Sequence, residues 1–218
     1  MNKPLAVIFD MDGVICDTNP YHSRAFRSFF NKRNLNPTDA EFAQHMFGKS
    51  NGYILSHFFN RPIEGKELKV LEDEKELLFR QSYEPHIEAI TGFEAFFNNL
   101  LENSVLLGVA TSAPRANLDL IMRKVSIAEK LGSILASENV SNHKPDPEVY
   151  LKSAANLGVS PDQCVVFEDS FSGISAALNA GMRVVGVLSS HQKEELPLCD
   201  RYIENYIGLD YEDIRSLF

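Results

Sequence analysis

The stretch LAVIFDMDGVICDT, residues 5–18, decides the fold. Its first five residues, Leu5–Phe9, carry no polar side chain, which is the pattern of a strand buried on both faces of a parallel sheet. Asp10 and Asp12 follow at the end of this run, and Gly13 comes next. In an open α/β sheet, ligands bind at the carboxyl ends of the strands. The stretch therefore predicts a buried first strand that presents two carboxylates to a ligand.

Three further apolar runs of strand length follow, with helix-period segments between them. The strands are expected at Val105–Ala110, Cys164–Phe167 and Val184–Leu188, and the helices at Phe93–Leu101, Asn117–Lys124, Pro147–Leu157 and Ser172–Ala180. Gly181 is expected to end the last of these helices. Such alternation predicts an α/β fold built on a doubly wound, parallel, Rossmann-like sheet.

One long segment, residues 21–83, has helical periodicity and no strand. Within it, Thr38 and Glu41 have the spacing of a capping box, which marks the start of a helix. This segment is expected to be an all-helical cap that acts as a lid over the substrate and limits access of water. The predicted domains are a core of residues 1–17 and 86–218 and an inserted helical cap of residues 18–85.

Composition limits the classes of function. The 21 Lys and Arg residues against 30 Asp and Glu give a net charge of −9, which argues against nucleic acid as a partner. No apolar run approaches the length of a membrane span or of a signal sequence, so a cytoplasmic protein is expected. The three cysteines are widely spaced and predict neither a disulfide framework nor a zinc site. We expect a monomer or a weak homodimer that binds a small molecule.

Polar and charged side chains gather where the predicted strands end. Because those ends meet at one edge of a parallel sheet, residues far apart in the sequence are expected to form one site. After the first strand, the candidates at this edge are Thr111, Ser112, Lys144, Glu168 and Asp169. Carboxylates that converge repel each other unless a cation lies among them, and Mg²⁺ prefers oxygen ligands. The residues therefore predict a Mg²⁺ site at Asp10, Glu168 and Asp169.

The same residues suit phosphoryl transfer. Thr111 and nearby backbone N–H groups can donate to phosphate oxygens, and Lys144 supplies positive charge to the transferring group. Asp10 can attack phosphorus to form an aspartyl-phosphate, while Asp12 can protonate the leaving oxygen and then activate the incoming one. Gly13 allows the tight turn after the strand. Each residue alone also has a plainer explanation as a turn, capping or surface residue, so the prediction rests on their combination.

These motifs resemble those of phosphotransferases of the haloacid dehalogenase (HAD) superfamily, in particular the β-phosphoglucomutase-like group with a helical cap. The matching residues are the D-x-D-G of Asp10–Gly13, Thr111, Lys144 before Pro145, the pair Glu168 and Asp169, and the G-I-x-A-A-x-x-A-G-M that starts at Gly173. The resemblance implies Asp10 as the nucleophile and Asp12 as the acid/base, with its backbone carbonyl on Mg²⁺. It also implies that Glu168 and Asp169 hold the metal. Because the second aspartate is present, the resemblance points away from the dehalogenase and phosphonatase branches.

The cap departs from the pattern of true β-phosphoglucomutases. Those enzymes use an arginine to grip the distal phosphate of a bisphosphorylated sugar, and this chain has Asn51 at that place, where Lys49 or Lys75 could compensate. After the second motif they have a lysine and an asparagine, and this chain has Arg115 in that stretch. His22 matches a hinge histidine of the mutases, and packing or capping is an equal alternative for it. The residues expected to contact substrate are Thr18, His22, Lys49, Asn51, Lys75, Ser112 and Arg115.

The sequence thus predicts a Mg²⁺-dependent phosphatase that hydrolyses a small phosphorylated metabolite, a sugar phosphate in particular, through an aspartyl-phosphate on Asp10. The alternative is a β-phosphoglucomutase, an isomerase that interconverts β-glucose 1-phosphate and glucose 6-phosphate. A third reading is a binding protein without turnover, against which the complete set of Asp10, Asp12, Lys144 and Asp169 argues.

Overall fold

The computed structural model describes residues 4–46 and 50–218, apart from the side chain of Ala43. The chain forms two compact units. The core unit comprises the chain up to Asp17 together with Ile87–Phe218, and the helical unit comprises Thr18–His86. Lys49, one of the predicted substrate-binding residues, lies outside the described residues.

The core unit is built on one sheet of six parallel strands in the order β3-β2-β1-β4-β5-β6. The strands are β1 (Ala6–Phe9), β2 (Leu106–Ala110), β3 (Ser133–Leu135), β4 (Cys164–Glu168), β5 (Arg183–Val187) and β6 (Arg201–Ile203). This is the strand order of a doubly wound, Rossmann-like sheet, and β1 lies at its centre. The predicted fold class is confirmed.

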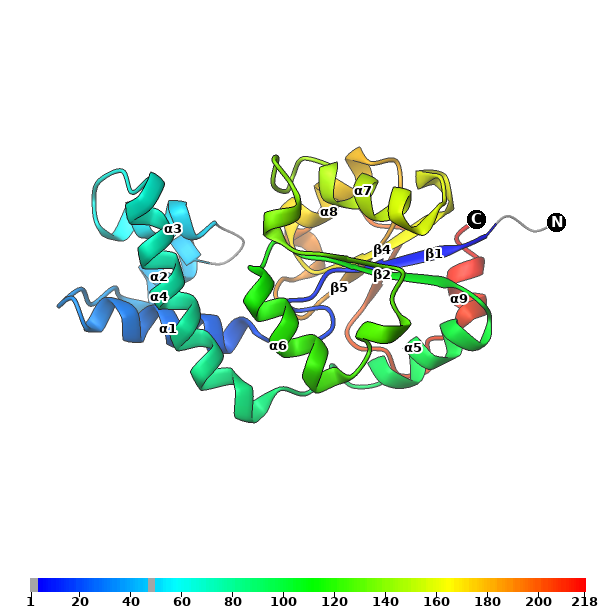
Figure 1. Ribbon diagram of the computed structural model, residues 1–218, viewed down its shortest axis with the longest axis horizontal. Helices are drawn as coiled ribbons and strands as arrows, with labels where there is room; N and C mark the ends of the chain where they lie inside the picture. Colours follow the sequence, from blue (N-terminus) through cyan, green and yellow to red (C-terminus); the bar gives the residue numbers. More distant parts are fainter. Residues whose placement is uncertain (1–3, 47–49) are drawn as a thin grey trace. The chain divides into compact units, whose positions relative to one another are not determined.

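Helices cover both faces of this sheet (Figure 1). They are α5 (Phe93–Glu102), α6 (Arg115–Val125), α7 (Glu148–Leu157), α8 (Phe171–Asn179) and α9 (Tyr211–Arg215), with 3₁₀ turns at Ala128–Lys130, Ser137–Asn139, Pro161–Gln163 and Lys193–Glu195. The helices α7 and α8 lie on one face, and α5, α6 and α9 lie on the other. Central strand β1 is fully buried because both faces are covered, which explains its uninterrupted apolar sequence.

Two of the six strands and the last helix are not among the predicted elements. Strands β3 and β6 are three residues long and form the two edges of the sheet. The sequence of β6, Arg-Tyr-Ile, is only partly buried and has no apolar run. Helix α9 is five residues long. Elements this short carry too few residues for a periodic pattern to be distinguished from a loop.

The helical unit contains α1 (Asn19–Asn31), α2 (Asp39–Met46), α3 (Asn51–Phe58), α4 (Gly65–Tyr83) and a 3₁₀ turn at Glu84–His86. Its interior is a cluster of apolar side chains that includes Phe26, Phe29 and Phe30 of α1. The predicted capping box at the start of α2 is confirmed: the Thr38 backbone N–H donates to Glu41 Oε2 over 2.8 Å, and the Glu41 N–H donates to Thr38 Oγ1 over 3.3 Å.

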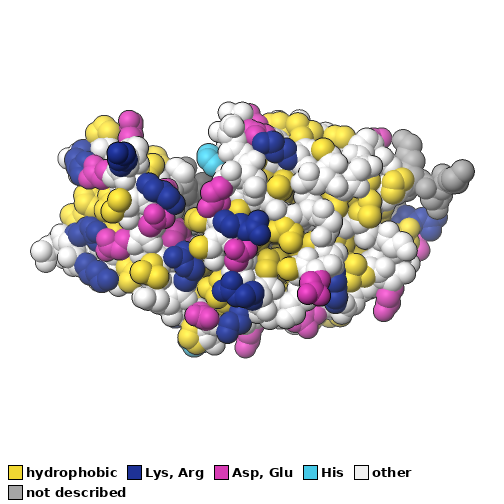
Figure 2. Space-filling view, in the orientation of Figure 1, with side chains coloured by type: hydrophobic (Ala, Val, Ile, Leu, Met, Phe, Trp, Pro, Cys, Tyr) yellow, Lys and Arg dark blue, Asp and Glu magenta, His cyan; other side chains and the backbone are white. Residues whose placement is uncertain are grey.

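The surface carries charges of both signs. On the face shown in Figure 2, Lys and Arg side chains alternate with Asp and Glu side chains, and they form no continuous basic area on that face. A basic stripe would be the electrostatic signature of a nucleic-acid-binding protein. Among the described residues, no helix combines the length and the apolar character needed to cross a membrane.

Candidate active site

The register of the sheet brings Asp10 next to Glu168. Strands β1 and β4 are parallel neighbours in which Phe9 is paired with Phe167, so the residues that follow these two positions lie side by side. The backbone N–H of Asp10 donates to the Phe167 carbonyl over 2.9 Å. Both acidic side chains are almost completely buried. Two residues 158 positions apart (168 − 10) thus meet because their strands end at the same edge of the sheet.

Lys144 lies between these two carboxylates. Its ammonium group donates to Asp10 Oδ1 over 2.6 Å and to Glu168 Oε1 over 2.7 Å. A longer contact of 3.3 Å reaches the carbonyl of Ala110, the last residue of β2. Burial alone lowers the pKa of Lys144, but the two carboxylates more than offset this effect and hold the pKa well above its ordinary value. Lys144 is therefore a fixed positive charge at the carboxyl ends of β1, β2 and β4.

Glu168 has a different environment from the one expected of a metal ligand. Its Oε1 accepts from Lys144 and from the Tyr150 hydroxyl at 3.0 Å. Its Oε2 accepts from the backbone N–H groups of Asp169 and Ser170, both at 2.9 Å, and from the Ser170 hydroxyl at 3.0 Å. Both oxygens are thus engaged by protein donors. Through these contacts Glu168 is bonded to Lys144 and to the loop that follows β4, and its role as a metal ligand stays a prediction.

Two glycines leave the space that these carboxylates occupy. A Cβ at position 173 would lie 1.6 Å from Glu168 Oε1, so a side chain there would displace the carboxylate. Gly13 has a φ of 72°, and a Cβ at that position would lie 2.0 Å from Asp169 Oδ2. The predicted tight turn after Asp12 is confirmed, with close approach to Asp169 as a second reason for glycine.

Asp169 is supported by a loop that the sequence did not indicate. The hydroxyl of Ser190, just after β5, donates to Asp169 Oδ2, and His191 Nδ1 donates to the Asp169 backbone carbonyl over 3.1 Å. The neighbouring Ser189 hydroxyl donates to the carbonyl of Gly13. The loop therefore ties Asp169 to the D-x-D-G turn. A small hydroxyl pair after a strand is common in turns, so only its position after a predicted strand could have suggested a role.

The buried carboxylates carry more negative charge than Lys144 can balance. Burial raises the pKa of Asp10 to about 7; Lys144 opposes this effect, while Glu168 and Asp12 add to it. Burial also raises the pKa of Asp169 well above its ordinary value, and the charges of Glu168 and Asp10 raise it further. Against these three buried acids, Lys144 supplies one positive charge. The ionised form of the site therefore needs a further cation.

The chemistry of these donors fits Mg²⁺. Asp10, Asp12 and Asp169 offer carboxylate oxygens, the ligands that this ion prefers, and Mg²⁺ commonly takes only one or two protein carboxylates together with waters. Among residues 4–46 and 50–218, no three acidic, histidine or cysteine side chains are already arranged as a ligand set. In the described arrangement one oxygen of Asp10 contacts Lys144 and one of Asp169 contacts Ser190.

The second-strand residues lie at the same edge. Thr111 follows β2 directly and is buried, and its Oγ1 accepts from the Ala113 backbone N–H over 3.0 Å. Ser112 beside it is exposed. Arg115 is exposed as well: its Nε donates to Asp119 over 2.8 Å, and its backbone N–H donates to Glu138. Thr111 thus belongs to the acidic edge, whereas the Arg115 guanidinium is engaged by its own helix.

In the helical unit, the predicted substrate-binding residues His22, Lys75 and Asn51 belong to one hydrogen-bonded group, which also contains Glu76, a residue that was not predicted. The Lys75 ammonium donates to His22 Nδ1 and to Glu76 Oε1, each over 2.8 Å. The Asn51 amide donates to the same Glu76 oxygen over 3.0 Å. Because an ammonium group only donates, Nδ1 of His22 accepts this bond. Thr18 is buried before α1, where its carbonyl accepts from the backbone of the helix's first turn.

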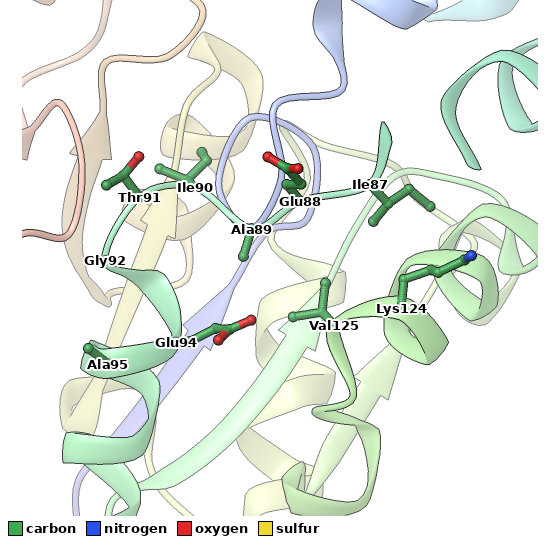
Figure 3. A pocket seen from close by; sticks show the side chains of 10 residues that line it. All are labelled: Ile87, Glu88, Ala89, Ile90, Thr91, Gly92, Glu94, Ala95, Lys124 and Val125. Carbon is green, nitrogen blue, oxygen red and sulfur yellow. The ribbon is translucent and has the colours of Figure 1, made fainter. Parts of the chain in front are cut away.

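A surface cavity of about 510 Å³ on the core unit lies elsewhere (Figure 3). It is lined by Ile87–Gly92, Glu94 and Ala95, and by Lys124 and Val125 at the end of α6. Its carboxylates, Glu88 and Glu94, point in different directions, and the Lys124 ammonium points away from both. None of the predicted site residues lines it. The acidic edge is therefore the candidate active site.

Comparison with known proteins agrees with this geometry. The family model described as haloacid dehalogenase-like hydrolase matches residues 7–187. β-Phosphoglucomutase of Bacillus subtilis is 34% identical over 191 residues, which cover 84% of this chain and 82% of the relative. A phosphorylated carbohydrates phosphatase of Thermotoga maritima is 31% identical over 85% of this chain and 86% of its own length. A crystal structure of a HAD hydrolase, family IA, variant 3, from Entamoeba histolytica superposes with a TM-score of 0.91 at 28% identity, over 98% of both chains. The chain therefore belongs to the haloacid dehalogenase-like hydrolase family and is a phosphoryl-transfer enzyme of that family.

Proposed function

We propose that this protein is a Mg²⁺-dependent phosphatase that hydrolyses a small sugar phosphate through an aspartyl-phosphate on Asp10. One observation carries the proposal: the Lys144 ammonium, whose side chain is 5% exposed, lies 2.6 Å from Oδ1 of Asp10, the predicted nucleophile. A phosphoryl group brought next to Asp10 would meet this charge. The relatives named for carbohydrate phosphates support the choice of substrate class.

Lys144 and Thr111 bind and orient the phosphoryl group. Lys144 offers charge-assisted donors to its oxygens, and the Thr111 hydroxyl, which already accepts from Ala113, can donate its own hydrogen. Ser112 adds a second hydroxyl at the same strand end. These groups counter the negative charge that spreads over the transferring oxygens, which is the main electrostatic demand of phosphoryl transfer.

Asp10 and Asp12 divide the bond changes between them. An Asp10 carboxylate oxygen forms a bond to phosphorus while the bond from phosphorus to the sugar oxygen breaks, and Asp12 gives its proton to that oxygen. In the second half, Asp12 takes a proton from a water molecule as the water oxygen attacks phosphorus. The bond from phosphorus to Asp10 then breaks, which releases inorganic phosphate and restores both aspartates.

Mg²⁺ would be held by Asp10 and Asp169 through their carboxylates. Asp12 would contribute its carboxylate or its backbone carbonyl. When bound there, the ion supplies positive charge that lets an ionised Asp10 and a phosphate approach each other. Glu168 acts through its bonds to Lys144 and to the loop that carries Asp169. Ser190 and His191 hold Asp169 in place from the other side.

The helical unit is proposed to act as the lid that limits water and recognises the rest of the substrate. The second candidate function, β-phosphoglucomutase, is favoured by the 34% identity to the Bacillus subtilis enzyme. A mutase must retain a bisphosphate intermediate and therefore needs a cation for the distal phosphate. Asn51 supplies no charge, and Lys75 is paired with Glu76, so the residues described favour hydrolysis.

A panel of sugar monophosphates tests this choice. The purified protein is incubated with each compound with Mg²⁺ or with EDTA, and both inorganic phosphate and isomerised sugar phosphate are measured. We expect phosphate as the main product, full dependence on Mg²⁺, and no turnover by Asp10→Asn. Turnover in EDTA would overturn the mechanism. Efficient conversion of β-glucose 1-phosphate to glucose 6-phosphate, primed by a trace of glucose 1,6-bisphosphate and with little phosphate released, would establish the mutase instead.

A further inference from the structure

The middle of α4 carries two adjacent charged residues that are buried in the helical unit. Lys75 is 2% exposed and Glu76 is 3% exposed. Lys75 bonds to His22 and Glu76 and also lies over the ring of Phe26, 4.4 Å from its centroid. Asn51, at the start of α3, bonds to Glu76. We call these four polar residues, His22, Asn51, Lys75 and Glu76, the α4 cluster.

This cluster is a poor way to stabilise a small helical bundle. Removing two charges from water costs several kcal/mol per ion, and apolar residues of similar volume often stabilise a protein equally well or better. The neighbouring side chains show that apolar packing was possible here, because the His22 ring stacks on Phe79 at 3.8 Å and Lys75 lies over Phe26. Buried ionisable groups without a stability benefit concentrate at functional sites.

The charges within the α4 cluster balance. In the described part of the chain, it contains one ammonium, from Lys75, and one carboxylate, from Glu76, 2.8 Å apart. A phosphate approaching Lys75 would also approach Glu76, and the repulsion would cancel much of the attraction. Sugar hydroxyls, in contrast, can both donate and accept. The His22 ring, the Asn51 amide and the Glu76 carboxylate provide both kinds of partner.

The chain connects this cluster to the catalytic loop. Helix α1, which carries His22 in its first turn, begins at Asn19, seven positions after Asp12 (19 − 12). Under the proposed function, the helical unit recognises the part of the substrate that lies beyond the transferred phosphate. The α4 cluster supplies polar groups that this recognition would use.

We propose that Glu76 is a specificity-determining residue: by neutralising Lys75, it makes the enzyme select monophosphates with an uncharged, hydroxylated far end and reject substrates that carry a second phosphate. The inference rests on the proposed function and deepens it. It assigns the discrimination against bisphosphates to the Glu76 carboxylate, which repels a second phosphate. The lack of a positive charge at Asn51 acts in the same direction.

The test compares Glu76→Gln with the wild type on a matched pair, fructose 1-phosphate and fructose 1,6-bisphosphate, or on the preferred monophosphate of the panel and its bisphosphate. Glutamine keeps the size and an acceptor oxygen but removes the charge. We expect kcat/KM for the bisphosphate, relative to the monophosphate, to rise about tenfold. Glu74→Gln, also on α4, removes the same charge from a carboxylate that is paired with Arg33 outside the α4 cluster, and should change the ratio by less than twofold.

A second variant tests whether the gain comes from Lys75. In Lys75→Met/Glu76→Gln the positive charge is gone, so the tenfold gain should disappear. Lys75→Met alone leaves Glu76 uncompensated and should lower the ratio below that of the wild type, which provides a readout if Glu76→Gln does not fold. A folding role alone would change the melting temperature and reduce both substrates equally.

The outcomes separate the two proposals. If the wild type releases phosphate from monophosphates but Glu76→Gln leaves the ratio unchanged, the role of Glu76 is overturned and the phosphatase stands. If the wild type hydrolyses the bisphosphate as well as the monophosphate, the role of Glu76 is likewise overturned. If the wild type releases phosphate from no monophosphate, the proposed function fails, and the proposal for Glu76 fails with it.

Discussion

Two buried lysines, one in each unit, have opposite charge surroundings. Lys144 in the core contacts two carboxylates, Asp10 and Glu168, with a third, Asp169, on the same edge. Lys75 in the helical unit contacts one carboxylate, Glu76, and a histidine ring nitrogen. Both lysine side chains are at most 5% exposed.

The surroundings of each lysine determine the charge of its site. The core edge carries an excess of negative charge. Burial raises the pKa values of Asp10 and Asp169, and repulsion between the neighbouring carboxylates raises them further. Under the proposed function, a bound cation offsets this charge and allows a phosphate to bind. The described charges of the α4 cluster balance, and by our proposal this cluster selects hydroxyl groups over a second phosphate.

The largest change in activity is expected for Asp10→Asn. Activity should fall on the order of 10⁴-fold or more, because the nucleophile is lost. Stability in EDTA should nevertheless rise, because a repelled carboxylate becomes neutral. The pKa of Asp10 is raised from 3.8 to about 7 in the folded protein, so the stability it contributes is lost as the pH rises through this window.

The gain in melting temperature for Asp10→Asn should therefore be larger at pH 8 than at pH 5. Differential scanning fluorimetry at the two pH values measures it. A variant that is less stable than the wild type at pH 8 would show that the core edge carries no excess charge.

Asp12→Ala separates the acid/base from the nucleophile. Loss of a positioned proton donor should lower the rate roughly 10²- to 10⁴-fold on sugar phosphates, whose leaving groups need a proton. On 4-nitrophenyl phosphate, which leaves without protonation, the loss should be much smaller. Steady-state kinetics on both substrates provide the measurement, and equal losses would refute the assignment of Asp12.

The matched pair Lys144→Met and Lys75→Met compares the two lysines directly. Without Lys144, two buried carboxylates face each other, and the free energy of unfolding should fall by about 3–5 kcal/mol at pH 8. Without Lys75, one carboxylate remains and keeps its bond from Asn51, so the loss should be roughly half as large. Urea denaturation in EDTA measures both. Equal losses would mean that the second carboxylate at the core adds no repulsion.

Ser190→Ala tests the support of Asp169 at the core edge. This hydroxyl donates to Asp169 Oδ2, and loss of such support for a metal ligand commonly weakens metal binding 10- to 100-fold. We expect about tenfold weaker Mg²⁺ binding, measured by titration calorimetry without substrate. Ser175→Ala on α8, whose hydroxyl donates to the Phe171 carbonyl over 2.7 Å, is the control and should leave Mg²⁺ affinity unchanged. The same affinity in both variants would contradict the role of Ser190.

The smallest effect is expected for Asn51→Arg. An arginine here would supply the cation that a mutase needs, but its guanidinium would lie beside Glu76 and pair with it. The ratio of isomer to phosphate from β-glucose 1-phosphate should therefore move by only about twofold. In Asn51→Arg/Glu76→Gln the same ratio should move by about tenfold. A full shift in the single variant would show that Glu76 does not control the charge of the α4 cluster.

The sequence predicted best where one pattern repeats over many residues. The apolar runs of β1, β2, β4 and β5 and the periodic helices between them were sufficient for the fold class. The short edge strands β3 and β6 were missed, because sheet neighbours and not local sequence determine them.

The same limit applies to the site. Asp10, Thr111, Lys144 and Asp169 could be proposed because each follows or faces a predicted strand end. Glu168 is bonded to five donors, and Ser190 and Glu76 are bonded to partners of their own. Most of these bonds connect segments whose distance in space no single sequence pattern specifies. The position of Glu168 at a strand end predicted a metal ligand but not these donors, and no sequence pattern singled out Glu76.

The two ends of the helical unit lie together, and this has a consequence for how such enzymes diversify. Tyr21, near the start of the unit, packs its ring against Tyr83 and His86 at the end, with centroids 4.6 and 5.6 Å away. On the core side, the Ile90 backbone N–H donates to the Ile15 carbonyl over 2.8 Å, so the two chain crossings are joined there as well. A segment that leaves and re-enters at neighbouring points can be exchanged by recombination as one cassette. Replacement of residues 18–86 by another helical segment with adjacent ends could then change substrate preference in a single genetic event, with the register of the six-stranded sheet intact.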